Sequence, residues 1–268
     1  MEENFQKAND LLLQRREFPH KMGESIVVVS GKGGTGKTSF TAGVGSALSL
    51  MGKRVLCLDG DIGLWNLDLA LGLTDRALMD FTDVALGRCT LEEAAVPHPR
   101  LPNLYLLTAP MGLGGTSLTG GDMYRLLRTA KSQFDYCLID APAGLGTGFQ
   151  LSACAADRAV VVTTTESTSL RDAQHTVMLL DSRFGPGELH LVVNRVRKKL
   201  LRSLHATIDD AIDTAGLPLV GVVPEDDALP LCLGRGIPRL LTDAPAAAAY
   251  RNIVKRITGV RVPLMRIK

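Results

Sequence analysis

The sequence predicts an α/β fold, in which one doubly wound domain has a mostly parallel sheet of about seven strands flanked by helices. Short, nearly continuous apolar runs rich in β-branched residues alternate with longer segments of helical periodicity. This alternation is typical of parallel strands that are buried on both faces. The first apolar run also leads directly into a glycine-rich turn followed by a helix. In folds of this kind ligands bind at the carboxyl ends of the strands.

Each expected strand is a short segment of low polarity, and the seven are Ser25–Ser30, Arg54–Asp59, Leu104–Leu107, Tyr136–Asp140, Ala159–Thr163, Leu189–Asn194 and Leu219–Val223. The expected helices are Lys37–Met51 and segments around residues 120–132, 168–183, 198–214 and 244–257. We see no linker that would divide this pattern. Residues 23–268 are therefore expected to form one domain.

Composition excludes several classes of protein. With 46% hydrophobic residues among 268, the chain can bury a sizeable core. A net charge of +2 and 4% aromatic residues do not indicate a nucleic-acid-binding protein. The five cysteines include no C-x-x-C pair, which argues against a disulfide framework and a zinc site and favours a reducing, cytoplasmic compartment. No apolar run approaches the roughly 18 residues of a membrane span.

Residues 1–22 are expected to form an N-terminal helical arm, because Phe5, Ala8, Leu11 and Leu12 lie near helical spacing. The arm could pack on the domain's own surface, or it could dock a partner protein. The sequence leaves both alternatives open.

A phosphate-binding loop is predicted between the first strand and the first helix of the domain. The segment 31–38 reads G-x-x-x-x-G-K-T. Glycines let successive backbone N–H groups surround a phosphate, Lys37 can reach the β- and γ-phosphates, and the Thr38 hydroxyl can bind Mg²⁺. The predicted ATP-binding residues of this loop are Gly31, Gly33, Gly34, Thr35, Gly36, Lys37, Thr38 and Ser39.

Carboxylates end two of the predicted strands. Asp59 and Asp61 lie two residues apart after the second strand, and Asp140 ends the fourth. One carboxylate of the Asp59–Asp61 pair can hold the water shell of a metal while the other orients an attacking water. Asp140 stands where nucleotide-binding folds place a carboxylate that binds the Mg²⁺ water shell.

Four segments resemble the MinD/ParA family of P-loop ATPases, which carries a deviant Walker A loop. They are KGGTGKT at 32–38, D-x-D-x-G-x-x-N-x-D at 59–68, I-D-A-P-A-G at 139–144, and residues 157–173, which end in R-D-A. The resemblance covers residues 25–265 and is greatest to MinD. It implies a P-loop NTPase fold of the SIMIBI class, with ATP and Mg²⁺ as ligands.

The resemblance also implies roles for individual residues. Lys32 would cross an ATP-dependent homodimer and neutralise charge on the partner's nucleotide. Asp61 would orient the attacking water, and Thr38, Asp59 and Asp140 would form the metal site. Two further loops would hold the adenine, and their residues are Asn194, Arg195, Pro224, Glu225 and Asp226.

Three residues are candidates for dimer or partner contacts: Trp65, Asn66 and Asp172. Trp65 departs from the family pattern, and it could instead fill a core position. Asp172 could instead be a favourable carboxylate in the first turn of a helix.

The resemblance implies a cytoplasmic ATPase switch that dimerises on ATP, hydrolyses it slowly, and controls a division site or flagellum number. An activating partner could bind residues 1–22, whose placement resembles the arm of FlhG proteins. No amphipathic membrane-targeting helix follows Pro263, so a partner would have to recruit the chain to a membrane. Two alternatives remain. One is a ParA-type DNA-partition ATPase that uses the basic residues near 195–202, and the other is a nucleotide-binding adaptor with little hydrolysis.

Overall fold

The computed structural model describes residues 22–62, 66–111, 118–197, 208–228 and 244–264. Its strands are Glu24–Val29 (β1), Val55–Asp59 (β2), Val96–Pro97 (β3), Leu104–Leu107 (β4), Tyr136–Asp140 (β5), Arg158–Thr163 (β6), Leu189–Val196 (β7) and Leu219–Pro224 (β8). Its helices are Lys37–Leu50 (α2), Leu67–Leu71 (α3), Phe81–Ala85 (α4), Leu91–Ala94 (α5), Gly120–Gln133 (α6), Thr147–Ala153 (α7), Ser167–Leu180 (α8), Ile208–Ala215 (α10) and Pro245–Ile257 (α12).

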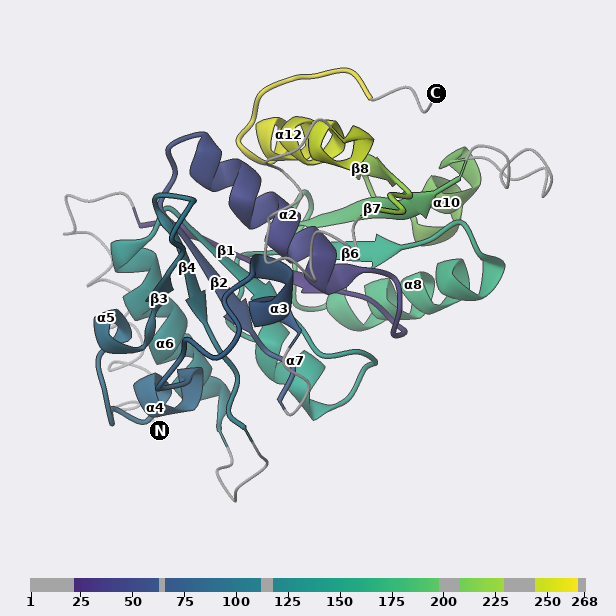
Figure 1. The fold of residues 1–268 in the computed structure, drawn as a ribbon. Coiled ribbons are helices and arrows are strands. Elements are labelled where there is room, and N and C mark those ends of the chain that lie inside the picture. Colours follow the sequence, from purple (N-terminus) through teal and green to yellow (C-terminus); the bar gives the residue numbers. More distant parts are fainter. Residues whose placement is uncertain (1–21, 63–65, 112–117, 198–207, 229–243, 265–268) are drawn as a thin grey trace, which may run out of the picture.

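The strands form one sheet in the order β3-β4-β2-β5-β1-β6-β7-β8 (Figure 1). Every pair is parallel except β3 with β4. The predicted doubly wound α/β fold is confirmed.

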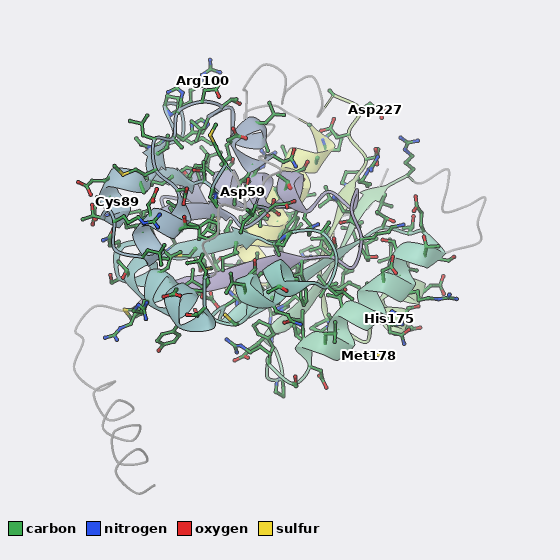
Figure 2. The ribbon with its side chains drawn as sticks, turned by 90° about the horizontal axis from the view of Figure 1, so that it is seen from below. Asp59, Cys89, Arg100, His175, Met178 and Asp227 are labelled. Carbon is green, nitrogen blue, oxygen red and sulfur yellow. The ribbon has the colours of Figure 1, made fainter. Side chains whose placement is uncertain are left out.

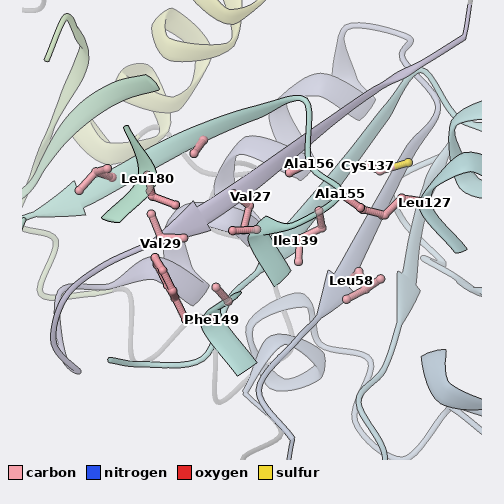
Figure 3. Packing of buried hydrophobic residues seen from close by; sticks show 14 of the residues in the cluster. Val27, Val29, Leu58, Leu127, Cys137, Ile139, Phe149, Ala155, Ala156 and Leu180 are labelled. Atoms are coloured by element: carbon pink, nitrogen blue, oxygen red, sulfur yellow. The ribbon is translucent and has the colours of Figure 1, made fainter. Parts of the chain in front are cut away.

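Alternating side chains of β1 divide the core into two layers. Ile26 and Val28 pack with α2, α3 and α12 on one face, whereas Val27 and Val29 pack with α4 to α8 and α10 on the other. Figure 3 shows part of this second layer, including Val27, Val29 and Ile139. Because both faces are covered, the part of β1 that lies in the core must be apolar, as Ile26–Val29 is.

A close contact between helices holds α2 against the C-terminal helix. A Cβ atom at Gly43 of α2 would lie 2.6 Å from ring atoms of Tyr250 on α12, so only glycine fits there. The Tyr250 ring also packs against Phe40, with 6.1 Å between ring centroids. The first half of helix α2, which begins at the phosphate loop, is thereby held against α12 (Figure 1).

The structure differs from the sequence prediction mainly at one edge of the sheet. An eighth strand, β3, pairs antiparallel to β4 at the edge, and its two residues are too few to produce an alternating pattern. The short helices α3, α4, α5 and α7 were also not predicted. Helix α8 ends at Leu180 rather than at residue 183. Of the helix expected at 198–214, residues 198–207 lie outside the described part, and α10 covers Ile208–Ala215. The N-terminal arm, residues 1–22, also lies outside it except for Met22.

Candidate nucleotide site

The glycine-rich loop connects β1 to α2, and its backbone requires glycine. Gly34 and Gly36 have φ angles of 81° and 88°, a region that other L-residues rarely adopt. A Cβ atom on Gly36 would also lie 2.4 Å from Nδ2 of Asn194. Within the described residues, no side-chain hydrogen bond caps the start of α2, so no side chain there competes with a ligand for the N–H groups of its first turn. The predicted phosphate loop is therefore present as a glycine turn that leads into a helix N-terminus, an arrangement that binds phosphate.

Lys37 is buried beneath this loop, with 8% of its surface exposed. Its Nζ donates to Oγ of Ser30 at 3.0 Å, and that hydroxyl donates to the carbonyl of Lys32 at 2.7 Å. Burial lowers the pKa of Lys37, while the charges of Asp140 and Asp61 act in the opposite direction. The ammonium group thus shares the site with two carboxylates.

Asp140 and Asp59 face each other across neighbouring strands, because β2 pairs with β5 in a register that matches these two residues. Burial raises the pKa of Asp140 to about 7 and that of Asp59 to about 6. Asp140 accepts hydrogen bonds from the hydroxyls of Thr38 at 2.6 Å and Thr41 at 3.2 Å. In Figure 2 the labelled Asp59 lies near the centre of the molecule, whereas Arg100, His175 and Met178 lie toward its outside.

Asp61 follows β2 and lies close to this pair. Its backbone N–H donates to Oδ1 of Asp59 at 3.0 Å. Burial raises the pKa of the Asp61 carboxyl, and the nearby charge of Lys37 lowers it. The structure therefore brings together Asp59, Asp61 and Asp140, as the sequence predicts.

Lys32 and Lys37 occupy different environments. The Nζ of Lys32 donates to Oε2 of Glu166 at 3.1 Å and to Oγ1 of Thr168 at 3.0 Å, both at the start of α8. Sequence reasoning missed Glu166 and Thr168 because nothing in the local sequence brings the end of β6 next to the loop after β1. Only the strand order, with β1 beside β6, does so.

Asn194 and Arg195 of β7 contact the phosphate loop. The Asn194 Nδ2 donates to the carbonyl of Thr35 at 2.8 Å, and the Arg195 guanidinium binds both the carbonyl of Gly34 and the carboxylate of Glu225. The amide nitrogen of Asn194 is thus bonded to the phosphate loop, and its contact with the adenine stays a prediction.

Pro224, Asp226 and Asp172 lie in or beside the loops of this site. Pro224 ends β8, and Asp226 follows it in the same loop, where its Oδ1 accepts from the N–H of Ala228 at 3.2 Å. Asp172 on α8 adjoins the start of the phosphate loop, because a Cβ atom on Gly31 would lie 2.5 Å from its carbonyl oxygen. Asn66 is exposed just before α3. Ser39 is half-buried in the first turn of α2, and Gly33 is exposed in the phosphate loop. Trp65 lies outside the described residues.

The residues present fit a Mg²⁺ nucleotide. Thr35 is buried, and among the described residues its Oγ1 has no hydrogen-bond partner. Burial raises the pKa of both Asp59 and Asp140, and a cation bound beside them would favour their charged forms. In the described part of the chain, no three His, Cys, Asp or Glu side chains form a complete metal cage.

Comparison with known proteins identifies the family. The model of the CobQ/CobB/MinD/ParA nucleotide-binding domain matches residues 26–239. The chain belongs to this family. It is 39% identical to the septum site-determining protein MinD of Bacillus subtilis over 246 residues, which span 91% of this chain and 92% of that protein.

Solved structures agree with this membership of the CobQ/CobB/MinD/ParA family. MinD in the Aquifex aeolicus MinC:MinD cell division complex has a TM-score of 0.84 and 35% identity, covering 91% of this chain and 99% of that one. Pyrococcus horikoshii MinD, solved with Mg-ADP, has a TM-score of 0.77 and 30% identity, covering 89% and 97%. The predicted resemblance to MinD is confirmed.

Within the described residues, no helix is both long and apolar enough to span a membrane.

Proposed function

We propose that this protein is a MinD-like ATPase that binds Mg-ATP, dimerises on it, and controls the placement of the division site. The observation that supports this proposal is the direct link between the phosphate loop and a carboxylate. Lys37 is buried beneath the loop, and the Thr38 hydroxyl donates to Asp140 at 2.6 Å. They lie in a chain that is 39% identical to a septum site-determining protein.

In this proposal a bound Mg²⁺ would supply positive charge beside the phosphates. The phosphate-loop N–H groups and Lys37 would hold the β- and γ-phosphates. The Thr38 hydroxyl would bind the metal, Asp59 and Asp140 would hold its water shell, and Asp61 would orient the attacking water. Lys32 exchanges its contact with Glu166 for the nucleotide of a second copy, where its charge stabilises the transition state.

Residues 23–268 would act as the ATPase domain and residues 1–22 as an arm. An activating protein is a further expected partner, and the Aquifex aeolicus structure is a complex of MinD with a second protein, MinC. Recruitment to a membrane through such a partner remains a prediction.

The DNA-partition alternative receives less support from the basic patch. Two of its arginines are already paired, Arg195 with Glu225 at 3.1 Å and Arg197 with Glu225 at 3.5 Å. Paired arginines contribute less to phosphate binding. Residues 198–207, which hold the rest of the patch, lie outside the described part.

Two measurements test the function. Purified protein should hydrolyse ATP slowly in the presence of Mg²⁺, and Lys37→Ala should bind no ATP, while the surface control Lys53→Ala should behave as the wild type. In a Bacillus subtilis strain that lacks its own MinD, the gene should suppress misplaced septa, and the Lys37→Ala variant should not. Tight ATP binding with no hydrolysis, even with candidate partners, would favour the adaptor. Salt-sensitive, ATP-dependent retention on DNA would favour the partition ATPase.

A further inference from the structure

The end of strand β7 holds two successive carbonyl groups of the phosphate loop. Asn194 Nδ2 donates to the carbonyl of Thr35 at 2.8 Å, and Arg195 Nη1 donates to the carbonyl of Gly34 at 3.0 Å. Both bonds join residues about 160 positions apart in the chain. They therefore depend on the fold rather than on local sequence.

Arg195 is itself held in place by a carboxylate from the next strand. Glu225 follows β8, and its two oxygens accept from Arg195 Nε at 3.1 Å and from Nη2 at 3.1 Å. The N–H of Glu225 donates to the carbonyl of Val196 at 3.1 Å, which keeps the two loops together. A bidentate ion pair of this kind restricts both the orientation and the position of the guanidinium.

The backbone of Arg195 also indicates a constrained position. Its φ angle is +57°, in the left-handed region that non-glycine residues adopt at a cost of about 1 kcal/mol or more. The two contacts of its guanidinium, with Gly34 and Glu225, compensate for that cost. An arginine with no contacts would not favour this conformation over an extended one.

The two bonds orient the phosphate loop. In a trans peptide unit the C=O and N–H groups point in opposite directions. When β7 holds the carbonyls of Gly34 and Thr35, the N–H groups of the same peptide units, those of Thr35 and Gly36, point away from β7. These N–H groups are among the donors that surround a phosphate in a loop of this type.

We propose that Arg195 and Glu225 are positioning residues that preset the phosphate loop, and that they act on the polyphosphate part of the ligand rather than on its base. This inference rests on the proposed function as an ATP-binding protein. It assigns Glu225 a role through Arg195, with no contact of its own to the nucleotide. It also links the loop after β8 to the geometry of the phosphate loop.

Binding of Mg-ATP and of Mg-tripolyphosphate, which has no base, distinguishes positioning of the phosphate loop from contact with the base. Both affinities should be measured by calorimetry for the wild type, Arg195→Lys and Glu225→Gln. We expect each substitution to weaken both ligands by a similar factor, about tenfold, as for the loss of a charge-assisted hydrogen bond. Arg197→Lys is the matched control, because Arg197 contacts Glu225 at 3.5 Å and, among the described residues, no hydrogen bond joins it to the loop. It should bind both ligands as the wild type does.

For Glu225→Gln, an electrostatic effect and a loss of positioning would change the affinity for tripolyphosphate in opposite directions. The substitution removes a negative charge near the site, so a simple electrostatic effect would strengthen tripolyphosphate binding, whereas loss of positioning weakens it. Stronger tripolyphosphate binding would overturn the proposal. Weaker ATP binding with unchanged tripolyphosphate binding would also overturn it, because that is the result expected of a contact with the base. Unchanged binding of both ligands would overturn it as well. A wild-type protein that binds no ATP would instead refute the proposed function.

Discussion

The hydroxyl of Thr38 donates to Oδ2 of Asp140 at 2.6 Å, and this bond joins the first turn of α2 to the end of β5. Asp140 is also bonded to Thr41, one turn further along α2. The carboxylate that is proposed to hold the metal is thus aligned by the same helix that begins at the phosphate loop. Binding of the metal and binding of the phosphates should therefore depend on each other.

Replacing Asp140 by Asn should remove the effect of Mg²⁺ on ADP binding. Asp140→Asn should bind ADP in the absence of Mg²⁺ about as well as the wild type does. It should lose the gain in affinity, about tenfold or more, that the metal gives the wild type. Calorimetric titrations with ADP, with and without Mg²⁺, measure this gain. A variant whose ADP affinity still rises with Mg²⁺ would remove Asp140 from the metal site.

Gly36→Ala should destabilise the protein and weaken nucleotide binding. The φ angle of 88° at Gly36 costs about 1–3 kcal/mol for alanine, and the new Cβ atom would collide with the Asn194 amide. Gly33→Ala is the control, since its Cβ atom would meet only the Cβ atom of Ala143, at 3.9 Å. Thermal unfolding should show a lower Tm for Gly36→Ala and little change for Gly33→Ala. Equal Tm values for the two variants would contradict the geometry.

Thr35→Val should stabilise the protein without nucleotide. The Thr35 hydroxyl is buried and has no hydrogen-bond partner among the described residues, a situation that costs about 1–3 kcal/mol. Valine has the same shape, so the Tm should rise by about 2–4 °C for each kcal/mol recovered. Thr41→Val, which removes a hydroxyl bonded to Asp140 and to the carbonyl of Lys37, should instead lower the Tm. A lower Tm for Thr35→Val would show that its hydroxyl is bonded after all.

His98 should make stability depend on pH. Its Nδ1 accepts from the N–H groups of Arg100 and Leu101 and its Nε2 lies 3.0 Å from the carbonyl of Leu71, so the folded protein holds the neutral ring. Burial lowers the pKa of His98. Below pH about 6.5 the unfolded chain takes up a proton that the folded one resists, and stability falls.

His98→Asn removes this titration while its Oδ1 can accept the same two N–H bonds. The difference in Tm between the wild type and His98→Asn should shrink as the pH falls from 7.5 to 5. A difference that stays constant over this range would show that His98 does not titrate differently in the folded state.

Much of the fold and of the site follows from local sequence. Seven of the eight strands were predicted to within two residues at each end because they are short, apolar and bounded by polar turns. Asp59 and Asp140 were expected to share a metal site from the family resemblance and from their places at strand ends, and the two residues are indeed paired in register between β2 and β5.

Other features could not be predicted from local sequence. Strand β3 has two residues, one of them Pro97, and is defined only by its pairing with β4. The contacts of Lys32 with Glu166, and of Asn194 with the loop, depend on the order of β1, β6 and β7 in the sheet. Asn194 was assigned to the adenine because an amide can read a base. That its amide nitrogen also donates to the carbonyl of Thr35 is visible only in the folded structure.

The proposed function requires an ATP-dependent switch between monomer and dimer, and the mass of the Asp61→Ala variant in solution reports on it. Asp61→Ala should bind Mg-ATP but lack the residue that orients water, so the dimer should persist. Light scattering should give the mass of a monomer with ADP and that of a dimer with Mg-ATP. The variant Asp61→Ala, Lys32→Ala should remain a monomer with both nucleotides. A mass that ATP does not change in Asp61→Ala would contradict the switch and the role of Lys32 across the dimer.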